Sequence, residues 1–344
     1  MKIIINGRFL TQNITGVQRF AHEIVKELDK IVKKNEIVIL IPKNILFKDL
    51  KYKNIEIKKV GILKGHLWEQ LELPYYVWRN QGRLLSLCNT APIINTGIVN
   101  ICDISPKINP NFFSKKFSIF YKVLYWFITK TSLKILTISN FSKVEIIENY
   151  KINPNKINVI HCGWQHMNGV IEDKKILEKL QLKNKEFYLG VSSINPNKNF
   201  KYIIELAKLY PEKIFVIAGK LNQKVFGDMN LEKIENLVWA GYVTDEELKA
   251  LYKNTLGFIY PSFYEGFGIP PLEALACGCK KVCVSNTSCL PEIFEDSVIY
   301  LNPYKVENIL NETEIIKEEN IRKILNKYSW EKSAKKIHEV FGEK

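Results

Sequence analysis

The stretch that decides the fold is residues 256–278, LGFIYPSFYEGFGIPPLEALACG. Its apolar beginning, residues 256–260, is typical of a buried strand, and a loop containing glycines follows it. Pro270 and Pro271 suit the first turn of a helix, and Gly278 is a typical residue just beyond a helix end. The stretch therefore predicts a strand, a loop and a helix in that order, the repeating unit of a parallel sheet.

The loop and the start of that helix have the chemistry of a diphosphate site. Gly266 and Gly268 let the backbone approach a ligand closely because they carry no Cβ. Backbone amides at a helix start, together with the helix dipole, attract an anion. Glu273 falls in the first turn, where its carboxylate can accept hydrogen bonds from the hydroxyls of a ribose. Taken alone, the two glutamates favour a structural explanation, with Glu273 as a dipole-complementing acid and Glu265 as a solvated loop residue, because such acids are common.

The same alternation of strand and helix runs through the whole chain. Low-apolar sequence at residues 168–175 divides the series and predicts two domains, 1–167 and 168–320, followed by a basic helical segment, 321–344, that can pack back on the first domain. We predict an α/β protein with two Rossmann-like, doubly wound domains facing each other across a cleft. The predicted strands are residues 3–6, 36–41, 84–87, 98–102, 133–138 and 157–161, then 187–191, 214–218, 237–240, 256–260, 281–285 and 298–301.

Composition narrows the class of protein. A chain of 344 residues exceeds one ordinary core, and its net charge of +14 implies attraction to anions without identifying them. Nucleic acid is not expected as a partner, since no basic recognition helix or stacking motif is present. The seven cysteines show no paired C-x-x-C spacing, so we expect no metal. Without a leader or a stretch of about 20 apolar residues, the sequence predicts a cytoplasmic protein.

Residues 261–278 resemble the signature of the retaining family-4 glycosyltransferases of GT-B fold, in which two glutamates flank seven residues. The resemblance extends well outside this stretch. Residues 194–199, INPNKN, are similar to the lysine-bearing loop of that family, and residues 239–244, WAGYVT, to its base-contacting loop. Residues 15–20, TGVQRF, and 137–143, TISNFSK, resemble stretches of its first half. The main motif also has the strand, loop and helix context that it requires.

The resemblance implies a transfer of a sugar, with retention and without metal or cofactor, from a UDP-, GDP- or dTDP-sugar to a growing surface glycan. The acceptor would be a glycan or lipid-linked glycan of the lipopolysaccharide O-chain or capsule type. Glu273 would hold the donor ribose, Glu265 would face the sugar, and Lys198 would neutralise the departing diphosphate. The resemblance gives Asp103 a place in the active site and implies further donor contacts at Gly16, Ser193, Val243, Gly266, Phe267, Gly268 and Ile269.

Two departures from the family pattern keep other functions open. Cys102 precedes Asp103 where many members have histidine, and a thiol is a weak hydrogen-bonding group. Ser193 stands in a segment where many members carry an arginine. An impaired relative acting as an assembly partner, or a nucleotide-sugar epimerase of the same fold, therefore stay as alternatives. Two site residues also have a purely structural interpretation. In it, Asp103 caps a turn and Lys198 is a solvated lysine.

Three further features have two interpretations each. The aromatic helix predicted at residues 113–130 carries lysines, so it suits an anionic membrane surface as well as a core. Residues 68–70, WEQ, and 88–90, CNT, resemble acceptor-side stretches of related enzymes, yet capping explains them equally. His161 and His166 are five apart with no third ligand in view, which favours a role other than metal binding.

Overall fold

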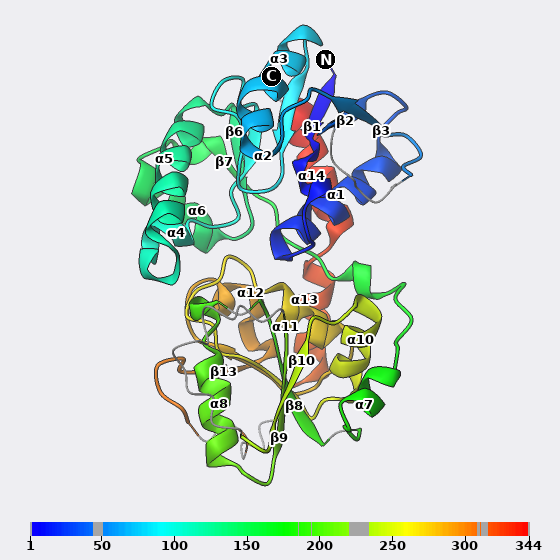
Figure 1. Cartoon of the computed structure of the whole chain (residues 1–344), viewed down its shortest axis with the longest axis vertical. Helices are drawn as coiled ribbons and strands as arrows, with labels where there is room; N and C mark the ends of the chain where they lie inside the picture. The colour runs from blue at the N-terminus through cyan, green and yellow to red at the C-terminus, as the bar shows by residue number, and fades with distance from the viewer. Residues whose placement is uncertain are drawn as a thin grey trace. The chain divides into compact units, whose positions relative to one another are not determined.

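The computed structural model describes residues 2–43, 51–184, 186–193, 195–219, 234–307, 310 and 316–342. Ile194 of the lysine-bearing loop lies outside the described residues. The chain divides into two compact units, Met1–Cys162 with Trp330–Lys344 and Gly163–Ser329, which Figure 1 shows in ribbon form. The division falls earlier than the predicted boundary at 168.

The described residues of the first unit form a seven-stranded parallel sheet in the order β3-β2-β1-β4-β5-β6-β7. Strands β1 and β2 are buried along their whole length, as expected for parallel strands with both faces covered. The strands are β1 (Ile3–Asn6), β2 (Ile37–Pro42), β3 (Glu56–Val60), β4 (Arg83–Ser86), β5 (Ile98–Asn100), β6 (Lys134–Thr137) and β7 (Ile157–Val159). The helices are α1 (Gly16–Ile31), α2 (Gly65–Leu67), α3 (Leu73–Arg79), α4 (Ser105–Ile108), α5 (Lys115–Thr131), α6 (Asn140–Tyr150) and α14 (Trp330–Gly342).

The described residues of the second unit form a six-stranded parallel sheet in the order β10-β9-β8-β11-β12-β13. Its core includes Ile203 of α8, Phe215 of β9 and Ile259 of β11. The strands are β8 (Phe187–Val191), β9 (Ile214–Ala218), β10 (Leu237–Gly241), β11 (Gly257–Tyr260), β12 (Val282–Ser285) and β13 (Ile299–Leu301). The helices are α7 (Lys175–Lys179), α8 (Phe200–Leu209), α10 (Asp245–Asn254), α11 (Ile269–Ala276), α12 (Leu290–Phe294) and α13 (Glu318–Lys327).

Both sheets are doubly wound, as the sequence predicts. The strand order reverses between β1 and β4 in the first unit and between β8 and β11 in the second. In open parallel sheets, ligands bind beyond the carboxyl ends of the strands at such a switch point. Each unit therefore has one position where its topology favours a binding site.

Every predicted strand has a counterpart, but β3 (Glu56–Val60) was missed. Its sequence, EIKKV, is mostly polar, and its side chains are exposed or half-buried. It lies at the end of the sheet, beside β2 only. Lysine on an edge strand hinders pairing with other chains, so the residues that suit this strand to its place also hide it from a hydrophobic pattern.

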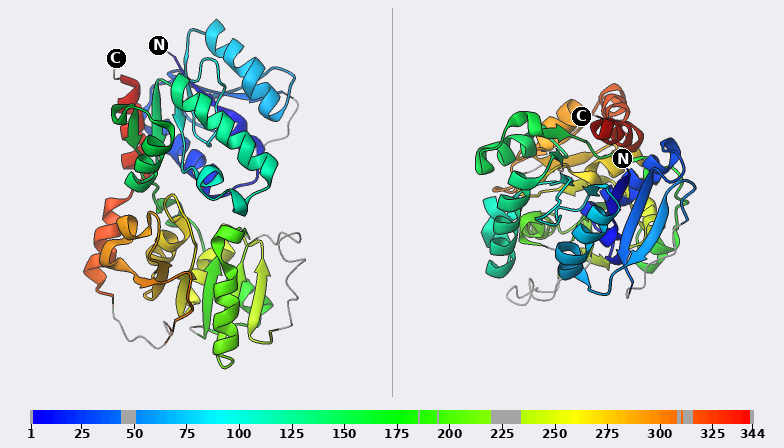
Figure 2. Two further views of the ribbon diagram at one scale, coloured as in Figure 1. Left: turned by 90° about the vertical axis from the view of Figure 1, so that its left-hand side faces the viewer. Right: turned by 90° about the horizontal axis from the view of Figure 1, so that it is seen from above.

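The helix predictions need one change. Capping boxes at Thr15 and Thr244 begin α1 and α10, as the residue types S/T-x-x-E/Q at these positions favour. The C-terminal helical stretch, however, is two helices, α13 and α14, in different units. In the first unit, Trp330 of α14 contacts Phe20 of α1 edge-on at 6.0 Å, and Figure 2 shows these helices side by side. The buried face of α14 includes Ala334 and Ile337, which are fully buried.

Candidate functional site

The switch point of the second unit holds a charged pair. Glu265 follows β11, Lys198 ends the loop after β8, and Nζ of Lys198 lies 2.7 Å from Oε1 of Glu265. Both side chains are mostly buried, with 16% of Lys198 and 10% of Glu265 exposed. Burial, followed by the charge of Glu265, raises the pKa of the neighbouring Tyr260 well above its ordinary value. The structure therefore brings together two of the predicted catalytic residues, 67 positions apart in sequence.

Hydrogen bonds hold the loop that contains Lys198 against the loop that precedes Glu265. The amide of Phe263 donates to the carbonyl of Asn197 at 2.9 Å. The side-chain amide of Asn199 donates to the carbonyls of Pro261 at 3.1 Å and Pro303 at 2.8 Å. Asn199 is itself in the left-handed conformation, with φ 52°, which asparagine tolerates better than most residues. The loop ahead of Glu265 is thereby fixed relative to Lys198 before any ligand arrives.

α11 begins as predicted, after Gly268 and with two prolines in its first turn. It offers fewer backbone N–H donors to an anion than we expected. Gly268 precedes the helix with φ 94°, and a Cβ there would come within 2.8 Å of Leu290. Pro270 and Pro271 follow within the first turn and carry no N–H. The amides available to an anion are therefore those of the glycine loop and of Ile269. The side chain of Phe267 faces inward, packed edge-on against Tyr328 at 5.2 Å, so this residue offers a ligand only its backbone.

Glu273 is held at both carboxylate oxygens. His166 Nε2 lies 2.8 Å from Oε1, and the hydroxyl of Tyr252 donates to Oε2 at 3.0 Å. Burial, followed by the charge of Glu273, raises the pKa of Tyr252 well above its ordinary value, so this tyrosine stays a donor. A carboxylate has about four acceptor sites, and acceptance of ribose hydroxyls by Glu273 stays a prediction. From the sequence, His166 was assigned only a role other than metal binding and Tyr252 was not named, because His166 is 107 residues from Glu273 and no local pattern links them.

The other predicted donor contacts lie at the ends of neighbouring strands. Ser193 follows β8 and is exposed, with its hydroxyl accepting from Asn195, while Val243 precedes the capped start of α10 and is half-buried. Gly219 directly follows β9 at the same end of the sheet, and it was not predicted as a site residue. A Cβ on Gly219 would meet the carbonyl oxygen of Ser192 at 1.8 Å, so only glycine fits there. Contact of Ser193 and Val243 with a donor stays a prediction.

In the first unit, Asp103 and Cys102 follow β5. Oδ1 of Asp103 accepts the amide of Ser105 at 2.9 Å, the capping contact that the structural interpretation anticipates. The Cys102 thiol is buried and accepts a hydrogen bond from Asn100 at 3.2 Å. Burial, followed by the charge of Asp103, raises the pKa of Cys102 to about 12, so this thiol is neutral. It does not substitute for a histidine at the surface of a site.

Gly16 begins α1 in the first unit. It is exposed, and a Cβ there would meet nothing within 4 Å. The described residues contain no group of three or more histidine, cysteine, aspartate or glutamate side chains able to hold a metal ion. The predicted roles of Gly16 and Asp103 stay predictions, as does the expected independence from metals.

Known proteins share this architecture. HepE from Anabaena, solved in complex with UDP and glucose, superposes with a TM-score of 0.73 over 100% of both chains at 15% sequence identity. The two doubly wound sheets thus form the GT-B fold. A family model described as glycosyl transferases group 1 matches residues 172–339. The stretch that matches this family model therefore contains Lys198, Glu265 and Glu273.

Two curated relatives have similar sequences. The O-antigen chain mannosyltransferase B of Escherichia coli is 32% identical over 189 residues, which are 51% of this chain and 49% of that protein. The O-antigen chain mannosyltransferase RfbU of Salmonella typhimurium is 24% identical over 320 residues, covering 88% of this chain and 87% of that protein. The alignment to the first of them thus spans about half of its length.

Proposed function

We propose that this protein transfers a hexose, with retention of configuration, from a nucleotide sugar to a growing surface glycan. The observation that carries the proposal is the second unit's switch point, where Lys198 and Glu265 are paired beside the glycine loop and Glu273 is oriented by two buried partners. A fixed cation next to a leaving diphosphate stabilises the charge that develops there, which is a large catalytic effect. The matching family domain covers these residues.

Each residue of this site has a defined part in the proposed reaction. Nζ of Lys198 has three donors, so it can keep its bond to Glu265 while it donates to a phosphate oxygen. The amides of the glycine loop face the diphosphate, and Glu273 accepts hydrogen bonds from the ribose. In a front-face displacement the departing phosphate takes the proton of the acceptor hydroxyl. The proposal requires no metal, because Lys198 and the amides supply the positive charge.

The relatives suggest which sugar is moved. Both curated relatives are named as O-antigen chain mannosyltransferases, so we propose mannose as the transferred sugar and an O-antigen-like chain as the acceptor. HepE was solved with UDP and glucose, which supports a nucleotide sugar as the donor class. A screen must decide which nucleotide carries the sugar: UDP, GDP or dTDP.

The test is a thermal-shift and turnover screen against UDP-, GDP- and dTDP-sugars. We expect one donor to raise the melting temperature and to be consumed only when a glycan acceptor is added. Glu273→Ala should abolish the shift, because the ribose loses its acceptor. A donor shift unaffected by Glu273→Ala contradicts the proposed site. Conversion of the donor to an isomer without acceptor would instead identify an epimerase, and binding without turnover would identify an impaired relative.

We also propose that the first unit docks on an anionic membrane that holds a lipid-linked acceptor. Among the described residues, no helix has the length and apolar character of a membrane span. The aromatic helix predicted at 113–130 is α5, and it divides its side chains between core and solvent. Leu124, Tyr125 and Ile128 are buried, whereas Ile119, Phe120, Val123 and Trp126 are exposed to 41% or more. Lysines 115, 116 and 122 on the same helix complement anionic headgroups.

A second exposed apolar group adds to this surface. Leu67, Leu71, Tyr75 and Trp78, from α2 through α3, are each at least 50% exposed. The ring of His66, which precedes Leu67, contacts the ring of Phe120 on α5 at 4.9 Å, so the two groups are continuous. Flotation with anionic vesicles tests the proposal. We expect binding that Trp78→Ser with Trp126→Ser weakens about tenfold, and no binding by the wild-type protein contradicts it.

A further inference from the structure

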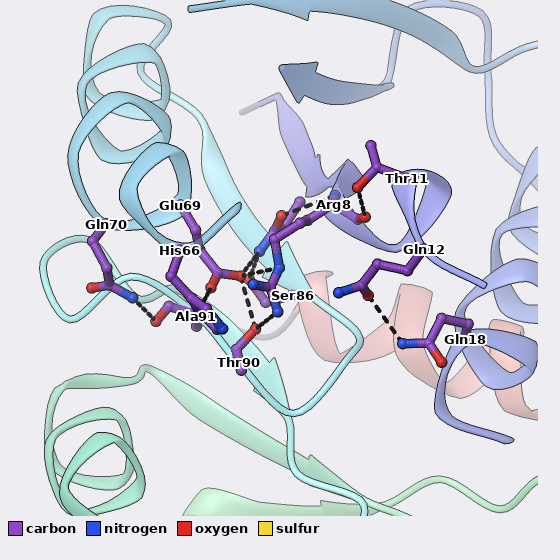
Figure 3. A network of polar contacts seen from close by, with 11 residues as sticks. Arg8, Thr11, Gln12, Gln18, His66, Glu69, Gln70, Ser86, Thr90 and Ala91 are labelled. Carbon is purple, nitrogen blue, oxygen red and sulfur yellow. Dashed lines mark hydrogen bonds and ion pairs between the residues drawn. The ribbon is translucent and has the colours of Figure 1, made fainter. Parts of the chain in front are cut away.

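The switch point of the first unit shows one way in which a protein fixes a glutamate. Nε of Arg8 lies 3.6 Å from Oε1 of Glu69, and that oxygen also accepts hydrogen bonds from Asn6 at 2.7 Å and Thr90 at 2.9 Å. Oε2 lies 3.2 Å from Nδ1 of His66. Figure 3 shows how these side chains converge from separate elements. Glu69 is thus oriented entirely through contacts to its carboxylate.

Glu265 of the second unit has another kind of support. Its carboxylate is paired with Lys198 at 2.7 Å. In addition, its backbone amide donates to the hydroxyl oxygen of Ser288 at 3.0 Å. Ser288 lies 23 residues further along the chain, in the loop between β12 and α12. Glu265 is therefore fixed through its backbone by a residue that the proposed donor site does not include.

The residue before Ser288 holds the same loop further upstream. The hydroxyl of Thr287 donates to the carbonyl of Phe263 at 3.2 Å, with the carbonyl of Ser262 at 3.4 Å. Both Thr287 and Ser288 are half-buried. These two residues, termed the hydroxyl clamp, hold the backbone at both ends of the turn from Ser262 to Glu265.

Ser288 adopts a backbone conformation that is unfavourable for serine. Its φ is 53°, in the left-handed region, which glycine adopts freely and which otherwise favours asparagine, aspartate and histidine. Such conformations persist only where the surroundings enforce them, and they cluster at functional sites. Glycine would fit the backbone at position 288 better, but it would lack the hydroxyl. What serine adds at this position is therefore the oxygen that accepts the amide of Glu265.

The groups downstream of Glu265 have anchors of their own. The ring of Phe267 packs edge-on against Tyr328 at 5.2 Å, and both carboxylate oxygens of Glu273 are held by buried partners. Loss of the hydroxyl clamp would leave these contacts in place. The clamp therefore acts on Glu265 and its pairing with Lys198, and much less on the groups that are expected to bind the donor.

From this arrangement we propose that Ser288 is a positioning residue for Glu265 in sugar transfer, with Thr287 as its support. Ser288 fixes the amide of Glu265, so that the carboxylate stays paired with Lys198 and faces the transferred sugar without reorganisation during the reaction. The inference rests on the proposed function, since it names the residue that prepares Glu265 for that transfer. It also predicts that position 288 contributes its hydroxyl and not its left-handed backbone.

Two substitutions at this one position separate the hydroxyl from the backbone. Ser288→Ala removes the hydroxyl and keeps Cβ, whereas Ser288→Gly removes both and relieves the left-handed conformation. We expect both variants to lower kcat about tenfold, with the donor KM and the donor-induced thermal shift within about twofold of the wild type. Gln181→Gly is the matched control, because Gln181 is an exposed residue of the second unit with φ 54°. Its kcat should equal that of the wild type.

Hydrogen exchange of the Glu265 amide is a readout that needs no turnover. It is measured by mass spectrometry with fragmentation that resolves single residues. The amide should exchange about tenfold faster in Ser288→Ala and Ser288→Gly than in the wild type, because it has lost its acceptor. Gln181→Gly should exchange at the wild-type rate.

Four results overturn the inference. They are wild-type kcat in both Ser288 variants, a loss in Ser288→Ala that Ser288→Gly restores, a donor KM that rises as much as kcat falls, and an amide whose exchange does not respond to loss of the hydroxyl. A wild-type protein that transfers no sugar from any donor, yet protects the Glu265 amide through Ser288, would instead overturn the proposed function and leave the hydroxyl clamp in place.

Discussion

The two switch points place a basic residue beside a glutamate in both units, yet the two pairs differ in burial and in what surrounds them. Lys198 and Glu265 lie 2.7 Å apart on loops, next to backbone amides that attract an anion. Arg8 and Glu69 lie 3.6 Å apart, and Glu69 is fully buried in a π-helical turn with three further partners. Parallel topology thus accounts for where a site forms, while the local partners decide what it binds.

The difference between the pairs has a physical consequence. Lys198 has a single acidic partner and flexible donors, so it can respond to charge that grows during a reaction. Glu69 is locked by four neighbours and cannot move without leaving buried groups unpaired. We therefore expect changes at Arg8 or Glu69 to act mainly on stability, and changes at Lys198 or Glu265 to act mainly on turnover.

The largest expected effect on folding is at Glu69. Glu69→Ala should lower the free energy of unfolding by about 3–5 kcal/mol, because it leaves the buried charge of Arg8 without its partner. Urea unfolding measures it. Glu265→Ala is the comparison, and we expect a smaller loss of about 2 kcal/mol there, because Glu265 is 10% exposed and its partner Lys198 16% exposed, whereas Glu69 is fully buried. Equal losses at the two positions would remove the distinction between the pairs.

Lys198 should show the reverse pattern. Lys198→Ala is expected to reduce kcat by about 10²–10³, because the leaving diphosphate loses its fixed cation, with a loss of stability smaller than that of Glu69→Ala. The control is Lys201→Ala on α8, a lysine that is 72% exposed and paired only with Glu205. Steady-state transfer assays compare the two. Unchanged turnover in Lys198→Ala would show that this pair is structural.

Substitution of two glycines at helix starts should have smaller effects on stability, and the two effects should differ from each other. Gly268→Ala should cost about 1–3 kcal/mol, because φ 94° is unfavourable for alanine and the new Cβ would press on Leu290. Gly16→Ala should be close to neutral, since open space surrounds that position. Thermal unfolding of both variants checks this. A neutral Gly268→Ala would mean that the loop before α11 can adopt another conformation.

The smallest expected effect concerns pH. The folded pKa of Glu69 lies below its ordinary value of 4.5, so its stabilising contribution is complete above that value and is lost as the pH falls through the folded pKa. Unfolding midpoints measured between pH 6 and pH 3 should therefore fall more steeply for the wild type than for Glu69→Gln. Parallel pH profiles would contradict an ionised Glu69 in the folded state.

Much of the fold was predictable because strands and helices leave local patterns. Buried parallel strands are continuous apolar runs, and the glycine loop with its two prolines marks the strand, loop and helix around Glu265. The edge strand β3 was not predicted because its side chains bury little surface. The break between α13 and α14 was not predicted because both helices have an apolar stripe. No local pattern indicates which unit each stripe will pack against.

The site was predictable only in part, for a similar reason. Glu265, Glu273 and Lys198 could be predicted as site residues because they belong to short motifs whose spacing has chemical meaning. His166 and Tyr252, which orient Glu273, approach it from distant segments and have no motif of their own. Arg8 was not singled out at all, since a lone arginine after a strand gives no indication of the glutamate that it will meet 61 residues later.

The sequence by itself determined that two parallel α/β sheets form, and it carried the prediction of a diphosphate site with one lysine and two glutamates. Local periodicity and motif spacing carry this information. Only the tertiary structure decided which side chains hold Glu273, where α14 packs, and that Arg8 and Glu69 meet at the switch point of the first unit. These contacts join segments far apart in the chain, and their geometry exists only once the strands have been ordered into a sheet.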